Sequence, residues 1–497
     1  MLGLRYMSLL KRDWPSREVV DEMVVLDEIR TGVNRGGTYG LFGAPEQFMH
    51  HARALGARFV RVNLFWSQVE PEPGVFDWGV VDSLVDQIEE DDEVWVTVCA
   101  GSPWGTRRAT RFLPASPAKE PATYERFVSA LVRRARGRVR FWQCEIEPNI
   151  PMLWSGAPDD YLEHLHTFHQ AVKQVDPRAL VALGGAVPSA MTGDEKGSGA
   201  GWIGYFDRVL AGARDRFDVF DIHPYGDPYQ IPAMIDACRR LMDAHGYGKP
   251  IVASEFNGPM PTAFPGNLPY LIEALAAHRR QALGESAIPE GGPLESKAQP
   301  GVAALYERMD ELPETLQMFL SGCSPELEAK RVRMSGRDIV MRTLLLLAGG
   351  VRRTAVFQLA PESPHEADIR TTRALMFGTF ALTDYDGEEV GRRRPTAATV
   401  ELLSHHLRGV TEVHRVDVAG APDVYLFDIR REPLGPLIVV WRQSAGFSIE
   451  DEPSADFDWP WPLPCAHAVD AFGAEVPMKI ADGRIHLPLS GTPVLIS

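Results

Sequence analysis

Two glutamates, each at the end of an apolar stretch, are the residues of this sequence best placed to do chemistry. The first stretch covers residues 141–147, and Pro148, which has no N–H to donate to a sheet, ends it. The second stretch, residues 249–255, is also short and apolar, and a glycine turn follows it. If both stretches are parallel strands of a barrel, the carboxylates of Glu147 and Glu255 lie at the same mouth. Two facing carboxylates are the minimum requirement for cleaving a glycosidic bond.

Glu145 is an alternative to Glu147. It lies two residues earlier and would therefore point to the same face of an extended strand. The Pro148-Asn149 pair that follows Glu147 favours Glu147 as the functional residue. Either glutamate could instead be a solvated residue at the rim of a sheet, but the matching contexts of the two strand ends favour a catalytic role.

Length, charge and cysteine content narrow the class of protein. The chain has 497 residues, enough for one large domain and a smaller one. Its net charge of −16 argues against nucleic acid or an anionic membrane surface as a partner. Five widely spaced cysteines form no C-x-x-C pair, which argues against structural zinc or a disulfide framework. Residues 1–14 do not resemble a signal peptide and no apolar run approaches a membrane span, so we expect a cytoplasmic protein.

Apolar stretches and helical patterns alternate between residues 26 and 359. The apolar stretches are nearly continuous, as expected for parallel strands buried on both faces. They predict eight strands, at residues 26–34, 58–65, 94–99, 141–147, 180–183, 219–223, 249–255 and 353–359. Helical patterns lie between them, at residues 45–55, 77–89, 123–136, 159–175, 202–211, 231–245 and 327–348. This order predicts an α/β protein with a (β/α)8 TIM barrel.

Two segments depart from the alternation. Within a long excursion at residues 259–333, residues 284–301 are rich in Gly, Pro, Glu and Ser and predict a mobile loop. From about residue 397, short strands between Gly and Pro turns predict a C-terminal antiparallel β-sandwich, with strands at 424–429, 436–441, 466–472, 484–489 and 494–496. We therefore divide the chain into an N-terminal segment (1–26) that could pack on the C-terminal domain, a catalytic barrel (27–396) and a β-sandwich (397–497).

Five short motifs occur along the barrel in a recognisable order. They are Arg61-Val62-Asn63 with Trp66, Ser102-Pro103-Trp104, Glu147-Pro148-Asn149, His223-Pro224-Tyr225, and residues 250–258. On these motifs, residues 31–359 resemble the clan-A retaining glycoside hydrolases, in particular the family that contains β-xylosidases and α-iduronidases. The resemblance implies a TIM barrel, often with an appended β-sandwich, in which the acid/base follows strand four and the nucleophile follows strand seven. Those positions are Glu147 and Glu255.

Retaining chemistry assigns a role to each of these residues. Glu255 would attack the anomeric carbon as a carboxylate, and Glu147 would protonate the leaving oxygen and then activate water. Arg61 would keep Glu255 ionised, and Tyr225 could donate a hydrogen bond to it. The full predicted substrate-binding set is Arg61, Asn63, Trp66, Trp104, Asn149, Trp154, His223, Tyr225, Phe357 and Gln358. We expect a carbohydrate substrate, no cofactor and no metal; the sequence leaves a homo-oligomer open.

Two positions depart from the family pattern. Asn normally precedes the acid/base, where this chain has Ile146, and the eighth strand usually carries a tryptophan where this chain has Phe357-Gln358. Because Ile146 cannot hydrogen-bond a sugar 2-hydroxyl, either Asn63 or Asn149 replaces that contact, or the sugar is deoxygenated, substituted or differently oriented at carbon 2. The sequence alone favours the second explanation.

Other function classes have less support. A catalytically silent carbohydrate-binding barrel is the main alternative, but a pseudoenzyme usually loses a carboxylate first, and both glutamates are present. The sequence contains no H-E-x-x-H, P-loop, G-x-S-x-G, or G-x-G-x-x-G after a strand, so peptidase, nucleotide-binding and esterase functions lack a motif. The pair His405-His406 has no clustered carboxylate and predicts a surface helix.

Overall fold

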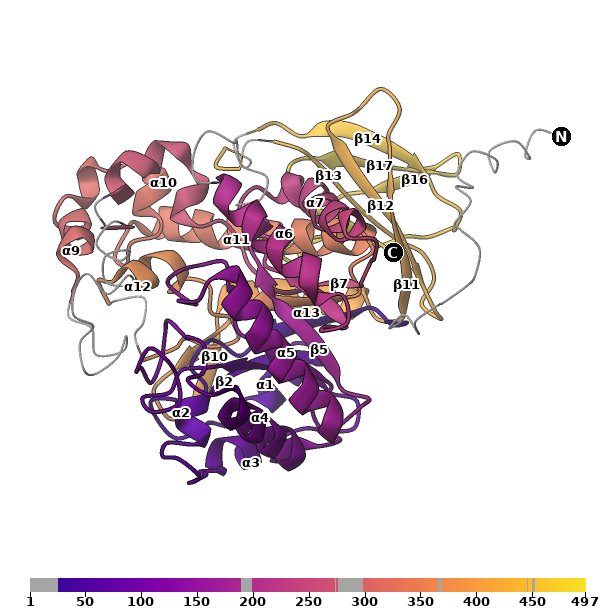
Figure 1. Ribbon diagram of the computed structural model, residues 1–497. Helices are drawn as coiled ribbons and strands as arrows, with labels where there is room; N and C mark the ends of the chain where they lie inside the picture. The colour runs from indigo at the N-terminus through magenta and orange to yellow at the C-terminus, as the bar shows by residue number, and fades with distance from the viewer. Residues whose placement is uncertain are drawn as a thin grey trace.

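The computed structural model describes residues 26–188, 199–272, 274–275, 298–364, 369–444, 446–448 and 452–497. In this part of the chain, eight parallel strands close into a barrel in sequence order, with helices around it (Figure 1). The strands are β1 (Arg30–Asn34), β2 (Phe59–Phe65), β3 (Glu93–Cys99), β4 (Phe141–Cys144), β5 (Leu180–Ala186), β6 (Val219–Ile222), β7 (Ile251–Phe256) and β8 (Arg353–Phe357). Pairing of β1 with both β2 and β8 closes the ring. The predicted TIM barrel is confirmed.

Several of the helices between the strands bury one apolar face. In α4 (Pro121–Ala135), proline occupies the first turn, where its missing N–H costs nothing, and the buried residues recur every three or four positions. The other helices that follow barrel strands are α1 (Met49–Ala54), α3 (Gly79–Asp86), α5 (Pro158–Val175), α6 (Gly199–Ala213), α7 (Ile231–Ala244), α11 (Pro325–Ala348) and α13 (Pro395–His406). Shorter helices lie in the connections: α2 (Trp66–Val69), α9 (Pro300–Glu307), α10 (Glu314–Gln317) and α12 (Thr372–Phe377).

Antiparallel sheets follow the barrel. A hairpin of β9 (Thr383–Tyr385) and β10 (Val390–Arg393) precedes α13. A five-stranded sheet has the order β11 (Val410–Val416), β12 (Val424–Arg431), β13 (Leu437–Arg442), β18 (Val494–Ile496) and β15 (Ala468–Asp470). A three-stranded sheet has the order β14 (Ala455–Pro460), β17 (Arg484–Leu489) and β16 (Lys479–Ala481). Apolar side chains of both sheets, among them Leu426, Val440 and Ile485, share one core. The predicted antiparallel β-sandwich is confirmed.

The sandwich is attached to the side of the barrel that carries α7 and α11, where Figure 1 shows it in yellow. Trp441 of β13 donates its indole N–H to the hydroxyl of Tyr229, just before α7, at 3.2 Å. Thr399 of α13 donates its hydroxyl to the carbonyl oxygen of Ala471 at 2.9 Å. These bonds and the apolar contacts around them connect the two parts of the protein.

The barrel interior is apolar at one end and polar at the other. Aromatic and aliphatic side chains from most strands fill the end nearest the strand N-termini: Phe59, Trp95, Phe141, Leu180, Val219, Val252 and Ala355. Because alternate residues of a strand share a face, the residues two positions further along the strands form the next layer. That layer contains Arg61, Thr97, Gln143, Asp221 and Ser254, all buried. The chemistry of the barrel therefore lies at its C-terminal end.

Some predicted boundaries need correction. The strand predicted for residues 141–147 ends at Cys144, because Glu145 has φ of 65° and Glu147 φ of 41°, values in the left-handed region that an extended strand cannot contain. His405 and His406 lie in the last turn of α13, and neither is buried, as predicted. Of the segment predicted as a mobile loop, residues 284–297 lie outside the described residues and residues 300–301 begin α9.

Residues 1–25 of the predicted N-terminal segment also lie outside the described part of the chain. Within the described residues, no helix combines the length and the apolar character that crossing a membrane requires.

Candidate active site

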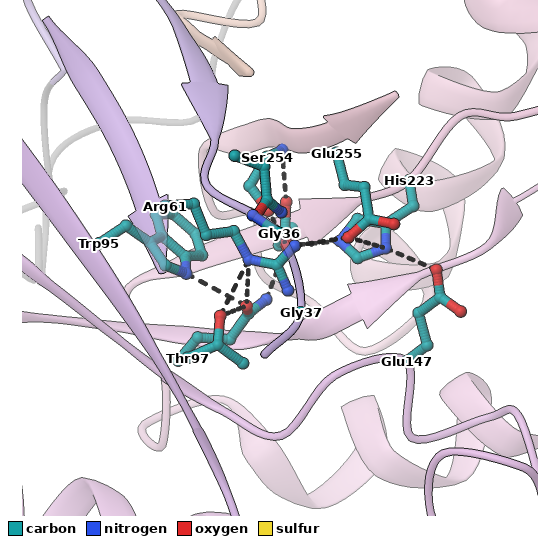
Figure 2. A network of polar contacts seen from close by, with 12 residues as sticks. Gly36, Gly37, Arg61, Trp95, Thr97, Glu147, His223, Ser254 and Glu255 are labelled. Atoms are coloured by element: carbon teal, nitrogen blue, oxygen red, sulfur yellow. Dashed lines mark hydrogen bonds and ion pairs between the residues drawn. The ribbon is translucent and has the colours of Figure 1, made fainter. Parts of the chain in front are cut away.

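Gln143 organises the polar layer beneath the mouth of the barrel. Its Oε1 accepts hydrogen bonds from Thr97 Oγ1 at 2.6 Å, Trp95 Nε1 at 3.1 Å and Arg61 Nε at 3.2 Å. Its Nε2 donates to Asp221 Oδ2 at 2.6 Å. Figure 2 shows this network with Arg61 at its centre and the guanidinium directed toward the two glutamates. The network fixes the arginine and Asp221 in position before any ligand binds.

Glu255 lies at the end of β7, as predicted, and points into the mouth. Between Ala253 and Phe256 the pairing of β7 with β8 shifts by one residue, which is a β-bulge. This extra residue allows the neighbouring Ser254 and Glu255 both to turn toward the interior. Arg61 Nη1 lies 2.6 Å from Glu255 Oε2, and the Tyr225 hydroxyl donates to Oε1 at 3.0 Å. Both predicted partners of Glu255 are therefore in contact with it.

Glu147 lies on the loop after β4, three residues beyond the end of the strand. Its side chain is 13% exposed, and its Oε1 lies 2.6 Å from His223 Nδ1. Figure 2 shows the dashed contact between the His223 ring and Glu147, with the Glu255 carboxylate drawn beside the same ring. His223 Nδ1 is also 3.8 Å from Glu255 Oε2. The imidazole thus faces both glutamates.

His223 is held in place by Asp221 and by the absence of a side chain at residue 185. Asp221 Oδ2 lies 3.1 Å from His223 Nε2. A Cβ atom at Gly185 would lie 2.2 Å from the same nitrogen, so only glycine leaves room for the ring. Burial lowers the pKa of His223, but the charges of Glu255 and Asp221 and the hydrogen bonds to Asp221 and Glu147 raise it to about 10. His223 is therefore a cation that donates from both ring nitrogens.

The surroundings of Glu147 favour its protonated form. Burial raises its pKa, the hydrogen bond and charge of His223 oppose this, and the nearby Glu255 carboxylate raises the pKa further. The net direction is upward. With Glu147 neutral, the carboxylates of Asp221 and Glu255 face the cations Arg61 and His223, so the charges of the buried site balance. An ionised Glu147 would add a third carboxylate to two cations.

The two glutamates are close together. Ligand-capable atoms of Glu147, His223 and Glu255 all lie within 4.8 Å of one another. The same three side chains could surround a metal ion, but an ion would have to displace the proton on His223 Nδ1. Two carboxyl groups at this distance, one paired with arginine and one with a raised pKa, can act as a nucleophile and a general acid.

Glu145, the alternative to Glu147, has a different environment. It is completely buried, and its Oε1 lies 3.0 Å from His164 Nε2 and accepts a hydrogen bond from the Ala100 amide at 2.9 Å. Burial raises its pKa, and His164 opposes that shift. The prediction that Glu145 and Glu147 share a face is wrong, because the chain has left the strand conformation at Glu145.

The three predicted tryptophans form part of the wall behind the mouth. Trp66 is fully buried and stacks on Phe127 of α4, with ring centroids 5.1 Å apart. Trp154 is 1% exposed and packs against His164, and Trp104 packs edge-on against Trp66 while keeping some exposure. The prediction that Trp66 and Trp154 contact the substrate is not supported in this conformation, since both rings are buried against protein side chains.

The remaining predicted residues lie around the mouth. Phe357 packs with Tyr225 and Phe380 in a small aromatic cluster beside Glu255. Gln358 is completely buried, and a Cβ at Gly36 would lie 2.9 Å from its side-chain oxygen. Gln358 thus lines the loop after β1.

Several buried polar side-chain groups of the described residues have no hydrogen-bond partner. Among the described residues, the Oδ1 of Asn63, both polar side-chain atoms of Asn149 and the Nη2 of Arg61 make no hydrogen bond. Such groups are costly to bury and are suited to binding a hydroxylated ligand.

The sequence interpretation did not identify Asp221, Ser254, Gln143 or Gly185. Asp221 could have been identified from the sequence, because it lies two residues before His223 and therefore on the same strand face. Gln143 stands two residues before Glu145 in an otherwise apolar strand, which also marks it as unusual. The role of Gly185 depends on a close approach between β5 and β6 that the sequence does not encode locally.

No protein-family model and no curated protein sequence matches the chain. Solved structures do match. A family 39 glycoside hydrolase from Bacteroides cellulosilyticus WH2 aligns at TM-score 0.59 and 15% identity, covering 96% of this chain and 82% of its own. A family 51 α-L-arabinofuranosidase from Bifidobacterium longum aligns at 0.56 and 11%, covering 95% and 97%. A glucosidase from Croceicoccus marinus aligns at 0.53 and 14%, covering 95% and 98%. The predicted likeness to clan-A glycoside hydrolases is thus confirmed at the level of the fold.

Proposed function

We propose that this protein is a retaining glycoside hydrolase that cleaves O-glycosidic bonds of small glycosides or oligosaccharides by double displacement. The proposal depends mainly on one observation: a carboxylate oxygen of Glu147 lies within 4.8 Å of one of Glu255. Retaining enzymes hold their carboxyl groups about 5 to 5.5 Å apart, whereas inverting enzymes need about 6.5 to 9.5 Å to admit a water between them. Nearest oxygens within 4.8 Å of each other are compatible with the retaining separation, and this supports direct attack by a carboxylate on the sugar.

In the first step, Glu255 attacks the anomeric carbon and forms an ester with it. The bond to the aglycone oxygen breaks, and that oxygen takes the proton of Glu147. Arg61 and Tyr225 hold the two oxygens of Glu255 and so orient the carboxylate for attack. Because the site is buried and already hydrogen-bonded, little reorganisation is needed.

In the second step, Glu147 removes a proton from water, and the hydroxide oxygen attacks the anomeric carbon. Glu255 leaves as a carboxylate, and the sugar is released with its original configuration. While Glu255 is esterified it carries no negative charge, so the repulsion that favours a protonated Glu147 is absent and Glu147 can act as a base. In the free enzyme His223 is hydrogen-bonded to Glu147. The same bond can hold Glu147 in place while it changes from acid to base.

The proposal is tested by the stereochemistry of turnover. The purified chain is incubated with a panel of 4-nitrophenyl α- and β-glycosides of pentoses, hexoses and uronic acids. For any glycoside that is cleaved, proton NMR identifies the anomer released first. We expect the anomer of the substrate, and we expect Glu255→Ala to abolish release. Release of the opposite anomer would contradict the proposal. Binding of glycosides without any cleavage would instead favour the silent carbohydrate-binding barrel.

A further inference from the structure

A second hollow lies outside the barrel mouth. A cavity of about 720 Å³ is bounded by the connection between α10 and α11, the first turns of α11, residues 378–384 and the start of α13. This volume is within the range of small-molecule sites. The floor is buried and includes Met318, Leu320, Gly378 and Ala381, whereas the rim residues Arg392, Arg393 and Ala398 are exposed. We call it the arginine cavity.

Four arginines line the arginine cavity, against two carboxylates. The arginines are Arg331, Arg392, Arg393 and Arg394, and the carboxylates are Glu328 and Asp384. Asp384 pairs with Arg394 at 2.9 Å and with Arg392 at 3.3 Å. Arg393 pairs with Glu401 of α13 at 2.6 Å. In a chain whose net charge is −16, this is a local excess of positive charge around a hollow.

Arg331 stands apart from the other three arginines. It is 8% exposed, and among the described residues its only hydrogen bond is a long one, 3.5 Å, from Nη1 to the carbonyl oxygen of Thr379. No carboxylate of the described chain lies within ion-pair distance of it. Burial lowers its pKa, Glu328 opposes this at longer range, and Arg394 lowers the pKa further. A buried guanidinium with no counter-ion is costly, and a bound anion would remove that cost.

We propose that the arginine cavity binds a small molecule through a phosphate group, with Arg331 as the buried anchor and Arg394 and Arg392 at the entrance. The guanidinium fork matches phosphate oxygens, and the charge of Arg331, which no described carboxylate pairs with, favours an anionic ligand. The cavity is larger than phosphate alone requires, so it has room for an organic part. The site is separate from the glutamates: Phe380 packs on Tyr225, whereas its neighbours Thr379 and Ala381 line the arginine cavity.

The binding test uses the full chain and calorimetry in a low-salt buffer free of phosphate. Three probes are titrated separately: glucose 6-phosphate, inorganic phosphate and glucose. We expect glucose 6-phosphate to bind more tightly than inorganic phosphate, and glucose to show no binding that depends on Arg331. Tighter binding of inorganic phosphate that is lost in the Arg331→Met and Ala398→Glu variants described below would support the site and identify free phosphate as its ligand. Absence of binding by both phosphate probes would overturn the proposal.

Variants separate this cavity from the glutamate site. Arg331→Met keeps an apolar stem and removes the charge, and we expect it to weaken phosphate binding at least tenfold. Arg240→Met, at an exposed arginine of α7, is the matched control and should bind as the wild type does. Unchanged affinity in Arg331→Met would contradict the assignment.

A second pair of variants leaves the buried arginine intact. Ala398→Glu places a carboxylate on the exposed rim and should weaken phosphate binding, whereas Ala398→Gln, of similar size, should not. This pair tests phosphate binding in the arginine cavity even if Arg331→Met does not fold. Equal affinities in the Glu and Gln variants would overturn the proposal. Without ligand, Arg331→Met should melt at or above the wild-type temperature, because it removes an uncompensated buried charge; a lower melting temperature would instead indicate a structural role for Arg331.

Discussion

His223 donates from Nδ1 to Glu147 Oε1 over 2.6 Å, although the two residues are 76 positions apart in the chain. This bond connects the loop after β4 to the end of β6. It also links Glu147 to Asp221, which binds the opposite nitrogen of the ring. Glu147 is therefore held in place by a charged partner rather than by its own strand, and its protonation depends on that partner.

Glu147→Gln should slow glycosides with poor leaving groups far more than activated aryl glycosides. Only the former need protonation on departure, and loss of a general acid costs about 10²- to 10⁴-fold. In Glu147→Ala, added azide should restore part of the activity by replacing the water that Glu147 activates. Steady-state rates across a series of aryl leaving groups provide the measurement. The matched control is Glu145→Gln, which should change stability more than leaving-group dependence. Equal slopes for wild type and Glu147→Gln would exclude Glu147 as the acid.

Gly185→Ala should reduce turnover by about a hundredfold, since a misplacement of about 1 Å in an active site can have that effect. The added Cβ would lie 2.2 Å from His223 Nε2, so the ring must shift away from Asp221 and Glu147. Gly204→Ala is the control, because a Cβ there meets nothing within 4 Å and alanine favours the helix. Kinetics and melting temperature are compared for both variants. Wild-type activity in a folded Gly185→Ala protein would show that the position of His223 is not critical.

The charge on His223 should make stability depend on pH. Its pKa rises from an ordinary 6.5 to about 10 in the folded protein. The folded state therefore binds the proton more tightly, so this contribution is complete below pH 6.5 and is lost as the pH rises through about 10. Comparing wild type with His223→Asn by denaturant unfolding between those limits isolates it. Wild type should lose more stability on going to high pH, by on the order of a few kcal/mol. Parallel curves would indicate that His223 is not a buried cation.

The order of the barrel strands and the closeness of Glu147 to Glu255 could be predicted from the sequence because both depend on where the apolar strands end. Buried parallel strands are nearly continuous apolar stretches, and Glu255 near the end of β7 and Tyr225 just beyond β6 lie where barrels place functional groups, whereas Arg61 lies within β2. The contacts of Arg61 and Tyr225 with Glu255 were expected from the resemblance to clan-A glycoside hydrolases, and both are present in the structure. In the C-terminal sheets, β11, β14 and β16 were not predicted because few of their side chains are buried, and their apolar pattern is correspondingly weak.

Other features depend on tertiary contacts. The left-handed conformation of Glu145 and Glu147 ends β4 early, and the residue types alone do not signal it. The bulge in β7 that turns Glu255 inward requires knowledge of its pairing with β8. Trp66 is the type of residue on which sugars stack, but in α2 its ring stacks on Phe127 of α4 instead. Aromatic residues near a site are thus poorly assigned from sequence, since burial and stacking use the same side chains.

We expect Asn63 or Asn149 to hydrogen-bond the 2-hydroxyl of the sugar, replacing the contact that Ile146 cannot make. The sequence alone favoured a sugar altered at carbon 2, but the structure leaves the buried Asn63 Oδ1 and both Asn149 side-chain groups without partners among the described residues. We predict that a 2-deoxy analogue of a cleaved glycoside loses at least a hundredfold in kcat/KM after correction for intrinsic reactivity. Asn63→Ala or Asn149→Ala should shrink that penalty. A penalty of tenfold or less in the wild type would restore the interpretation based on Ile146.

The central claim, that Glu255 attacks the sugar, is tested most directly by trapping the covalent intermediate. The wild type is incubated with the 2,4-dinitrophenyl 2-deoxy-2-fluoro analogue of whichever sugar it cleaves, and the protein and its peptides are analysed by mass spectrometry. We predict one label per chain, on Glu255, with inactivation in proportion to labelling and no label in Glu255→Ala. A label on Glu147 or Glu145, or complete hydrolysis of the parent glycoside without any label on Glu255, would contradict the account.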